Sequence, residues 1–307
     1  MMIIKTIEEM RSKVAERRRQ AGKDEKESRI GFVPTLGYLH KGHASLLKRA
    51  REECGTVVLS IFVNPLQFGP NEDFERYPRD PERDSAIAEQ EGVDFIFMPD
   101  VTEMYPQKIL TTVSVSGITE GLCGASRPGH FDGVATVVTK LFNIVQPDRA
   151  YFGMKDVQQV AVIQQMVRDL NMNVEIIPCP TLREEDGLAL SSRNVYLSAE
   201  ERTQALVLQL SLNEAEEWVR QPGIRSRELR QNIISRIATA PLAEIDYVEI
   251  VSYPSFLPLE DEEPVTAAVN DGQLLIALAV RFGQTRLIDN RLYSLGDQDT
   301  KEEANRV

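Results

Sequence analysis

The sequence predicts an α/β protein in which a Rossmann-like, doubly wound parallel sheet is followed by a smaller α+β lid domain. Short apolar or β-branched runs alternate with helical patterns up to about residue 180, which is typical of βαβ units. Beyond that point helical patterns come first and strand-like runs follow. The net charge of −12 divides into −3 over residues 1–182 and −9 over residues 183–307. We therefore expect two domains, 1–182 and 183–307.

Strands and helices are expected to alternate in the first domain. Its strands are expected at Ile30–Pro34, Thr56–Val63, Val93–Met98, Arg149–Phe152 and Val174–Pro178. The most regular helical pattern is Val134–Val145, whose apolar residues recur on one helix face. The other helices are expected from His40 to about Glu53, over Pro81–Gly92, and from Lys155 to Leu170.

Helices are expected to open the second domain. Ser198-Ala199-Glu200-Glu201 matches a capping box and predicts a long helix that ends near Pro222-Gly223. Ser226 is expected to cap a second helix that runs to about Thr239. Strands are expected at Ile245–Val251, Val265–Val269 and Gln273–Val280, with a hairpin turn at Asp271-Gly272 and a frayed tail from Gly296.

Composition excludes several classes of protein. A net charge of −12 argues against a basic, nucleic-acid-coating surface. A redox role has no support, because the sequence contains no Gly-x-Gly-x-x-Gly motif. No segment approaches about 18–20 uninterrupted apolar residues, so we expect no membrane span. The cysteines, Cys54, Cys123 and Cys179, have neither disulfide-framework nor zinc spacing, and the N-terminus does not resemble a signal peptide. We therefore expect a cytoplasmic protein.

The loop after the first predicted strand has the composition of an anion site. His40 and His43 are three residues apart at a helix start, where backbone N–H groups and the helix dipole favour negative charge. Gly37 and Gly42 allow close backbone approach to a ligand. The alternative is a capped helix with two surface histidines. We favour the anion site because the pair follows a strand end, where doubly wound sheets bind ligands.

Three further segments carry polar groups at strand ends or in a loop. Asn64 and Gln67 offer amides suited to hydroxyls or a carboxylate, although a simple proline-glycine turn explains them equally well. Lys155 and Asp156 begin a helix and suit a phosphate and ribose hydroxyls, unless they form an ordinary helix start. The loop Arg183–Asn194 contains a Ser-Ser-Arg sequence that suits a polyphosphate, or it is an interdomain linker.

Taken in order, these motifs resemble those of the nucleotidylyltransferase superfamily, which has a His-x-Gly-His motif. More narrowly, they resemble the pantothenate synthetase (pantoate–β-alanine ligase) family over about residues 3–290. The motifs that carry the resemblance are Val33–His43, Ser60–Gly69, Arg127–Gly133, Tyr151–Gln159, Arg183–Asn194 and Gly283–Asn290.

The resemblance implies an ATP- and Mg²⁺-dependent condensation of pantoate with β-alanine through a pantoyl-adenylate, in a homodimer formed by the first domain. It implies His43 as proton donor, with His40, Lys155 and Arg193 as the other catalytic residues. The residues implied to bind ATP are Leu36, Gly37, His40, His43, Gly153, Lys155, Asp156, Leu182, Leu190, Ser191, Ser192 and Arg193. Those implied to bind substrate are Pro34, Leu36, Asn64, Gln67 and Gln159, with Gln67 and Gln159 holding the hydroxyl and carboxylate of pantoate. No residue is implied as a metal ligand.

The sequence departs from the family pattern at four positions. Leu36 and Leu190 replace methionines, Met154 replaces an acidic residue, and Val157 replaces a tyrosine. Two other functions stay open: a nucleotidylyltransferase that acts on a phosphate ester, and a nucleotide-binding paralogue without turnover. The first would not require the two glutamines, whereas only Met154 favours the second.

Overall fold

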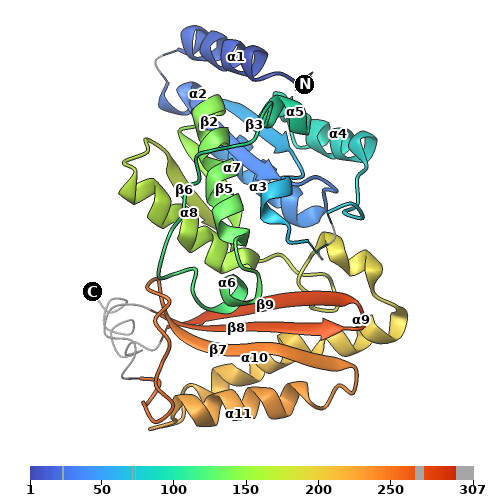
Figure 1. Ribbon diagram of the computed structural model, residues 1–307, viewed down its shortest axis with the longest axis vertical. Helices are drawn as coiled ribbons and strands as arrows, with labels where there is room; N and C mark the ends of the chain where they lie inside the picture. The colour runs from blue at the N-terminus through green and yellow to red at the C-terminus, as the bar shows by residue number, and fades with distance from the viewer. Residues whose placement is uncertain (23, 71, 73, 267–272, 295–307) are drawn as a thin grey trace, which may run out of the picture. The chain divides into compact units, whose positions relative to one another are not determined.

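The computed structural model describes residues 1–22, 24–70, 72, 74–266 and 273–294, which form two compact units (Figure 1). The first unit comprises Met1–Glu184 and Ala189–Val195. The second comprises Glu185–Leu188 and the chain from Tyr196 onward. The segment Ala189–Val195 thus lies in the first unit, although it follows the boundary expected at 182/183.

The first unit is built on a six-stranded parallel sheet with the strand order β1-β4-β3-β2-β5-β6. The chain winds from β2 through β3 to β4 and then returns to add β5 and β6 on the other side of β2. The sheet is therefore doubly wound, with a topological switch point between β2 and β5. The strands are β1 (Met2–Ile4), β2 (Ile30–Thr35), β3 (Thr56–Ile61), β4 (Phe95–Phe97), β5 (Arg149–Gly153) and β6 (Glu175–Cys179).

Helices cover both faces of this sheet. Phe32 of β2 meets Phe142 of α7 edge-to-face, with ring centroids 6.3 Å apart. Its neighbour Val33 points to the opposite face and shares a buried cluster with Leu47 of α3. The helices of this unit are α1 (Ile7–Gln20), α2 (Glu25–Ser28), α3 (Lys41–Glu53), α4 (Pro81–Gln90), α5 (Val101–Met104), α6 (Leu122–Ser126), α7 (His130–Val145) and α8 (Val157–Asp169). Two 3₁₀ turns, η1 (Pro65–Gln67) and η2 (Met154–Asp156), follow β3 and β5.

The second unit packs helices on a three-stranded antiparallel sheet. Its helices are α9 (Ala199–Ala205), α10 (Val207–Trp218) and α11 (Ser226–Ile237), after the 3₁₀ turn η3 (Ser192–Tyr196). Its strands, in the order β7-β8-β9, are β7 (Ala243–Tyr253), β8 (Gln273–Phe282) and β9 (Thr285–Tyr293). A buried cluster that includes Leu212, Ile233 and Ile276 joins the helices to the sheet. This unit has its own apolar core.

Several details differ from the sequence-based expectations. The long helix predicted from Ser198 is two helices that meet at Leu206, and Ser226 is the first residue of α11 because Arg225 occupies the N-cap. Strands β1 and β9 were not expected. Val265 lies in a turn, whereas residues 267–269, the predicted turn Asp271-Gly272 and the tail from Gly296 lie outside the described residues. The helix expected from Lys155 begins with η2 and becomes α-helical at Val157.

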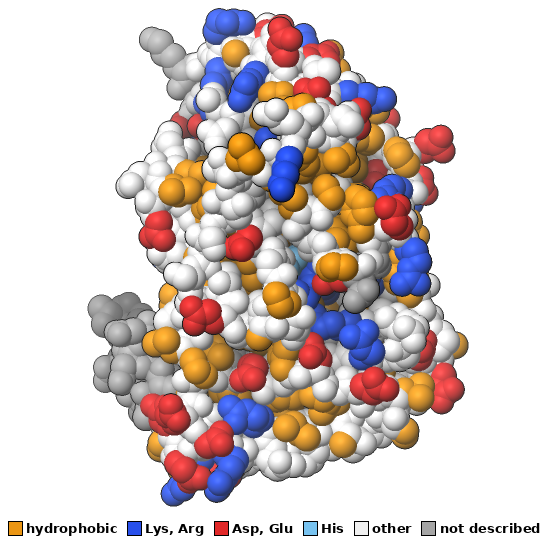
Figure 2. All heavy atoms as spheres, in the orientation of Figure 1, with side chains coloured by type: hydrophobic (Ala, Val, Ile, Leu, Met, Phe, Trp, Pro, Cys, Tyr) orange, Lys and Arg blue, Asp and Glu red, His pale blue; other side chains and the backbone are white. Residues whose placement is uncertain are grey.

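On the face drawn in Figure 2, acidic and basic side chains are interspersed and do not form one continuous basic stripe. No helix of the described residues is long and apolar enough to cross a membrane. Cys54, Cys123 and Cys179 are buried thiols that form no disulfide.

Candidate active site

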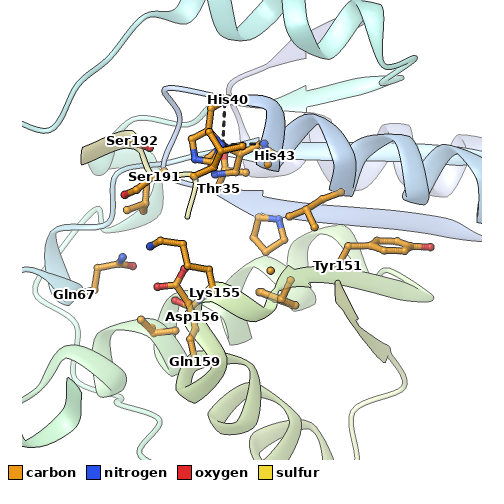
Figure 3. Close-up of a pocket in the computed structure, with 18 of the residues that line it drawn as sticks. Thr35, His40, His43, Gln67, Tyr151, Lys155, Asp156, Gln159, Ser191 and Ser192 are labelled. Carbon is orange, nitrogen blue, oxygen red and sulfur yellow. Dashed lines mark hydrogen bonds between the residues drawn. The ribbon is translucent and has the colours of Figure 1, made fainter. Parts of the chain in front are cut away.

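A pocket opens at the carboxyl ends of β2, β3 and β5, beside the topological switch point (Figure 3). Every residue that lines it belongs to the first unit. Parallel sheets bind ligands at this edge because several loops converge there. The predicted site residues that line the pocket are Pro34, Leu36, His40, His43, Gln67, Gly153, Lys155, Asp156, Gln159, Leu182, Leu190, Ser191, Ser192 and Arg193.

Two predicted site residues, Gly37 and Asn64, do not line the pocket. Gly37 is buried with a φ of 92°, a left-handed conformation that favours glycine. Its N–H donates to Thr35 Oγ1 at 3.2 Å. Asn64 is fully buried behind Gln67. Both residues shape the loops that carry pocket residues.

His40 and His43 form a reciprocal cap at the start of α3. The His40 N–H donates to His43 Nδ1 at 3.3 Å, and the Gly42 N–H donates to His40 Nδ1 at 3.1 Å (Figure 3). The rings lie 4.1 Å apart between centroids. Because both Nδ1 atoms accept hydrogen bonds, the proton of each neutral imidazole is on Nε2. The site therefore offers two imidazole N–H donors.

The electrostatic setting keeps both imidazoles neutral. Burial, helped by the charges of Lys155 and Arg83, lowers the pKa of His40 to about 4. Burial, the neighbouring His40 and Lys155 hold the pKa of His43 well below its usual value. At neutral pH these side chains donate hydrogen bonds and carry no charge.

The backbone N–H groups of the loop before α3 were expected to be available to an anion, but most of them are not. The N–H groups of Gly37, Tyr38, Leu39, His40 and Gly42 all donate to side chains of the protein. These amides are therefore occupied, and the donors that remain for an anion are chiefly the imidazole Nε2–H groups. The expectation of an anion site stands, but its donors are mostly side chains.

Asn64 fixes the orientation of the Gln67 amide. Its Nδ2 donates to Gly133 O at 3.1 Å and to Gln67 Oε1 at 3.3 Å, while its Oδ1 accepts from Leu66 N and from the Tyr105 hydroxyl. Since a carbonyl only accepts, Gly133 determines which end of the Asn64 amide is Nδ2. Gln67 must then present Oε1 to Asn64, and its Nε2 has no partner among the described residues. Gln67 points into the cavity in Figure 3 and so offers N–H donors there.

Arg127 and His130 hold the backbone carbonyl of Gln67, whereas Asn64 holds its side chain. Arg127 Nη2 and His130 Nδ1 both donate to Gln67 O, at 3.2 and 2.8 Å. His130 Nε2 accepts from Arg127 Nη1 at 3.1 Å, and Arg127 also pairs with Glu72. Burial and the Arg127 charge lower the pKa of His130 to about 4. The motif Arg127–Gly133 therefore supports the pocket loop that carries Gln67.

The opposite side of the cavity carries Lys155, Asp156 and Gln159, from η2 and the first turn of α8 (Figure 3). They follow the end of β5, so the sheet places them across the pocket from the histidines. Among the described residues that line the pocket, Asp156 is the one carboxylate. No group of three metal-ligating side chains exists in the described part of the chain.

The loop that contains Ser191, Ser192 and Arg193 is tied to the pocket. Leu190 N donates to Leu182 O at 3.0 Å, which brings both leucines to the pocket wall. Tyr77 is buried, its hydroxyl donates to Ser192 Oγ at 3.4 Å, and the Arg193 guanidinium lies 5.7 Å from its ring centroid. Tyr77 was not anticipated from the sequence, because nothing distinguishes it from a surface tyrosine.

An apolar wall from α7 also lines the pocket and was not predicted as part of the site. The periodic residues of this helix were expected to be core, the usual role of such a face. In the structure these residues are buried in the core, and several of them also line the cavity. The residues concerned are Val134, Val137, Val138 and Leu141, with Phe62 from the end of β3 beside them.

Comparisons with known proteins agree with this fold and pocket. A family model described as pantoate-beta-alanine ligase matches residues 2–292. The pantothenate synthetase of Acetivibrio thermocellus is 60% identical over 261 residues, which cover 85% of this chain and 90% of that protein. That of Pelotomaculum thermopropionicum is 56% identical over 292 residues, covering 95% and 99%.

Solved structures give the same result. The pantothenate synthetase from Thermus thermophilus superposes with a TM-score of 0.85 at 47% identity, covering 96% of this chain and 100% of that one. A pantoate-beta-alanine ligase from Francisella tularensis, complexed with beta-gamma ATP and beta-alanine, has a TM-score of 0.72 at 37% identity, covering 96% and 99%. Because the family model matches residues 2–292, nearly the whole of the chain, this chain belongs to the pantoate–β-alanine ligase family.

Proposed function

We propose that this protein condenses pantoate with β-alanine to form pantothenate, using ATP and releasing AMP and pyrophosphate. One observation carries the proposal: a single pocket joins a polyphosphate-type donor set to a site for a small branched hydroxy acid. The donor set is His40, His43, Lys155 and Arg193. Beside it, Gln67 and Gln159 suit a carboxylate and a hydroxyl, and the α7 valines suit the two methyl groups of pantoate.

In the first step, the pantoate carboxylate attacks the α-phosphorus of ATP, and the bond to pyrophosphate breaks. Negative charge moves to the leaving phosphate oxygens, so fixed donors aimed at them lower the barrier. The neutral imidazoles of His40 and His43 donate from Nε2, and Lys155 and Arg193 supply positive charge. Gln67 and Gln159 hold the nucleophile in place, which adds a proximity contribution. The product is pantoyl-adenylate.

In the second step, the β-alanine amine attacks the activated carbonyl, the new C–N bond forms, and AMP leaves. His43 is a poor base for the amine proton, because its pKa is low and its Nδ1 already accepts a backbone N–H. We assign the proton to the departing AMP phosphate. The Ser191–Arg193 loop, which lines the pocket, would keep water from the adenylate.

Magnesium enters this proposal as part of the substrate, MgATP. Mg²⁺ commonly binds substrate phosphates and waters with one or two protein carboxylates. Asp156, the carboxylate that lines the pocket, fits that pattern and is equally suited to the ribose hydroxyls.

We also propose a cytoplasmic homodimer formed through the first unit. The three buried cysteines, none of which forms a disulfide, fit a reducing compartment. Leu110 of the first unit is 91% exposed, an apolar side chain that a second copy would cover. Light scattering should give twice the chain mass, and Leu110→Arg should lower it toward that of one chain. A monomeric wild-type protein would refute the dimer.

The function is tested by measuring AMP formation with ATP, Mg²⁺, pantoate and β-alanine, and then omitting each in turn. AMP should require all four, whereas pyrophosphate exchange into ATP should require pantoate but not β-alanine. Transfer of AMP to a phosphate ester without pantoate would favour the other nucleotidylyltransferase reaction. ATP binding without any turnover would favour a paralogue that only binds nucleotide.

A further inference from the structure

Asp84 is a buried acidic residue that no pocket contact explains. It lies in the first turn of α4, is 1% exposed and does not line the pocket. Burying a carboxylate is unfavourable unless hydrogen bonds compensate, and burial raises the pKa of Asp84. A solvent-exposed helix position would have avoided that cost. The burial of this carboxylate is therefore explained only if nearby groups hydrogen-bond to it.

Its two oxygens hold two successive backbone groups of the histidine loop. The Tyr38 N–H donates to Asp84 Oδ2 at 2.8 Å, and the Leu39 N–H donates to Asp84 Oδ1 at 2.6 Å. These distances are at the short end for N–H···O bonds, as expected for a charged acceptor. Leu39 immediately precedes His40, which caps α3.

The turn held in this way is conformationally unfavourable by itself. Gly37 and Tyr38 both have left-handed φ values, 92° and 50°. A tyrosine rarely adopts this region without support from its surroundings. The guanidinium of Arg83, next to Asp84 on α4, lies 4.7 Å from the centroid of the Tyr38 ring. Helix α4 therefore holds Tyr38 by both its backbone and its ring.

We propose that Asp84 is a positioning residue, which fixes the Gly37–Leu39 turn and thereby sets the positions of the His40 and His43 imidazoles. The proposal rests on the function proposed above. The reciprocal cap makes the imidazoles sensitive to this turn, because the His40 N–H that follows Leu39 is the donor to His43 Nδ1. Asp84→Asn would turn one acceptor into an N–H donor facing a backbone N–H, and Asp84→Glu would displace the carboxylate by one methylene.

Kinetics separate this role from general structural support. Both variants should lower the rate of pantoate-dependent pyrophosphate release by about 10²-fold, the cost expected of a displacement near 1 Å. The KM for pantoate should change less than about threefold, because Gln67 is held by other residues. Supplied pantoyl-adenylate should react with β-alanine at the wild-type rate. Wild-type pyrophosphate release in the folded variants would overturn the proposal.

Two comparisons complete the experiment. Asp80→Ala removes the N-cap of the same helix, where Asp80 accepts from Arg83 N at 3.1 Å, and should leave the rate within about twofold of wild type. In a His40→Ala/His43→Ala background, Asp84→Asn should add less than about twofold, because residues that act through one another are not additive. An unchanged effect in that background would show that Asp84 acts elsewhere.

A spectroscopic readout does not depend on the reaction. The ¹⁵N signals of His40 and His43 should shift in the Asp84 variants, whereas those of His130 should not. Unchanged signals would refute the positioning role even if the enzyme is active. Absence of pantoate-dependent pyrophosphate release from the wild-type protein would instead refute the proposed function alone.

Discussion

Asn64 Nδ2 donates to Gln67 Oε1 at 3.3 Å, and this contact turns the Gln67 N–H groups toward the cavity. Asn64→Ala should therefore raise the KM for pantoate by about tenfold, because Gln67 loses its fixed orientation. The KM for ATP should stay within about threefold of wild type. The free energy of unfolding should fall by about 1–3 kcal/mol, since Gly133 O and the Tyr105 hydroxyl lose a buried partner. Initial-rate kinetics and denaturant unfolding test both effects.

Gln67→Ala should raise the KM for pantoate more than Asn64→Ala does, by about 10- to 100-fold, because it removes the donor itself. Unlike Asn64→Ala, it should cost little stability, since Gln67 faces a cavity. Initial rates at varied pantoate and varied ATP measure the two constants. If the KM for ATP rises more than that for pantoate, Gln67 belongs to the nucleotide side.

His43→Ala should lower pantoate-dependent pyrophosphate release by about 10²–10³-fold, the usual cost of losing a donor to a charged transition state. Far-ultraviolet circular dichroism should remain that of the wild type, because the cap in which the Gly42 N–H donates to His40 Nδ1 persists. Stopped-flow or coupled pyrophosphate assays give the rate. Near-normal release would contradict the assignment of His43 to the phosphates.

The histidine tautomers give a test that needs no substrate. Long-range ¹⁵N correlation spectra at pH 7 should show His40 and His43 as Nε2–H tautomers and His130 as the Nδ1–H tautomer, since its Nδ1 donates to Gln67 O. With three histidines in the chain, assignment by single substitutions is direct. A charged imidazolium at any of them at pH 7 would contradict the buried, neutral site.

The pH dependence of stability follows from the same burial. The pKa of His40 is about 4 in the folded protein, against 6.5 in an unconstrained chain. Between these values the unfolded chain binds more protons, so the stability that neutral His40 provides is complete above pH 6.5 and is lost as the pH falls toward 4. His40→Gln should reduce this dependence in urea titrations from pH 4 to 7. An identical pH profile in the variant would rule out His40 as its source.

Much of the sheet could be predicted because buried parallel strands are short, continuous apolar runs. Ile30–Thr35 and Thr56–Ile61 have that character, and both were expected within two residues. Strand β9 was not expected, because Asp289 and Asn290 are adjacent, polar and both buried. The break at Leu206 was also invisible, since the apolar pattern continues across it.

The sequence alone predicted a doubly wound parallel sheet whose strand ends carry the site loops, because alternating strands and helices favour parallel strands with helices on both faces. Together with the family resemblance of the motifs, the sequence also predicted that His40, His43, Gln67 and Lys155 belong to one site, and all four line one pocket. The tertiary structure decided how these groups are presented, since that depends on contacts between residues distant in the chain. Asp84 holds the backbone of Leu39 from another helix, and Asn64 sets the Gln67 amide through Gly133. No local pattern encodes such hydrogen bonds, because each partner is chosen by packing.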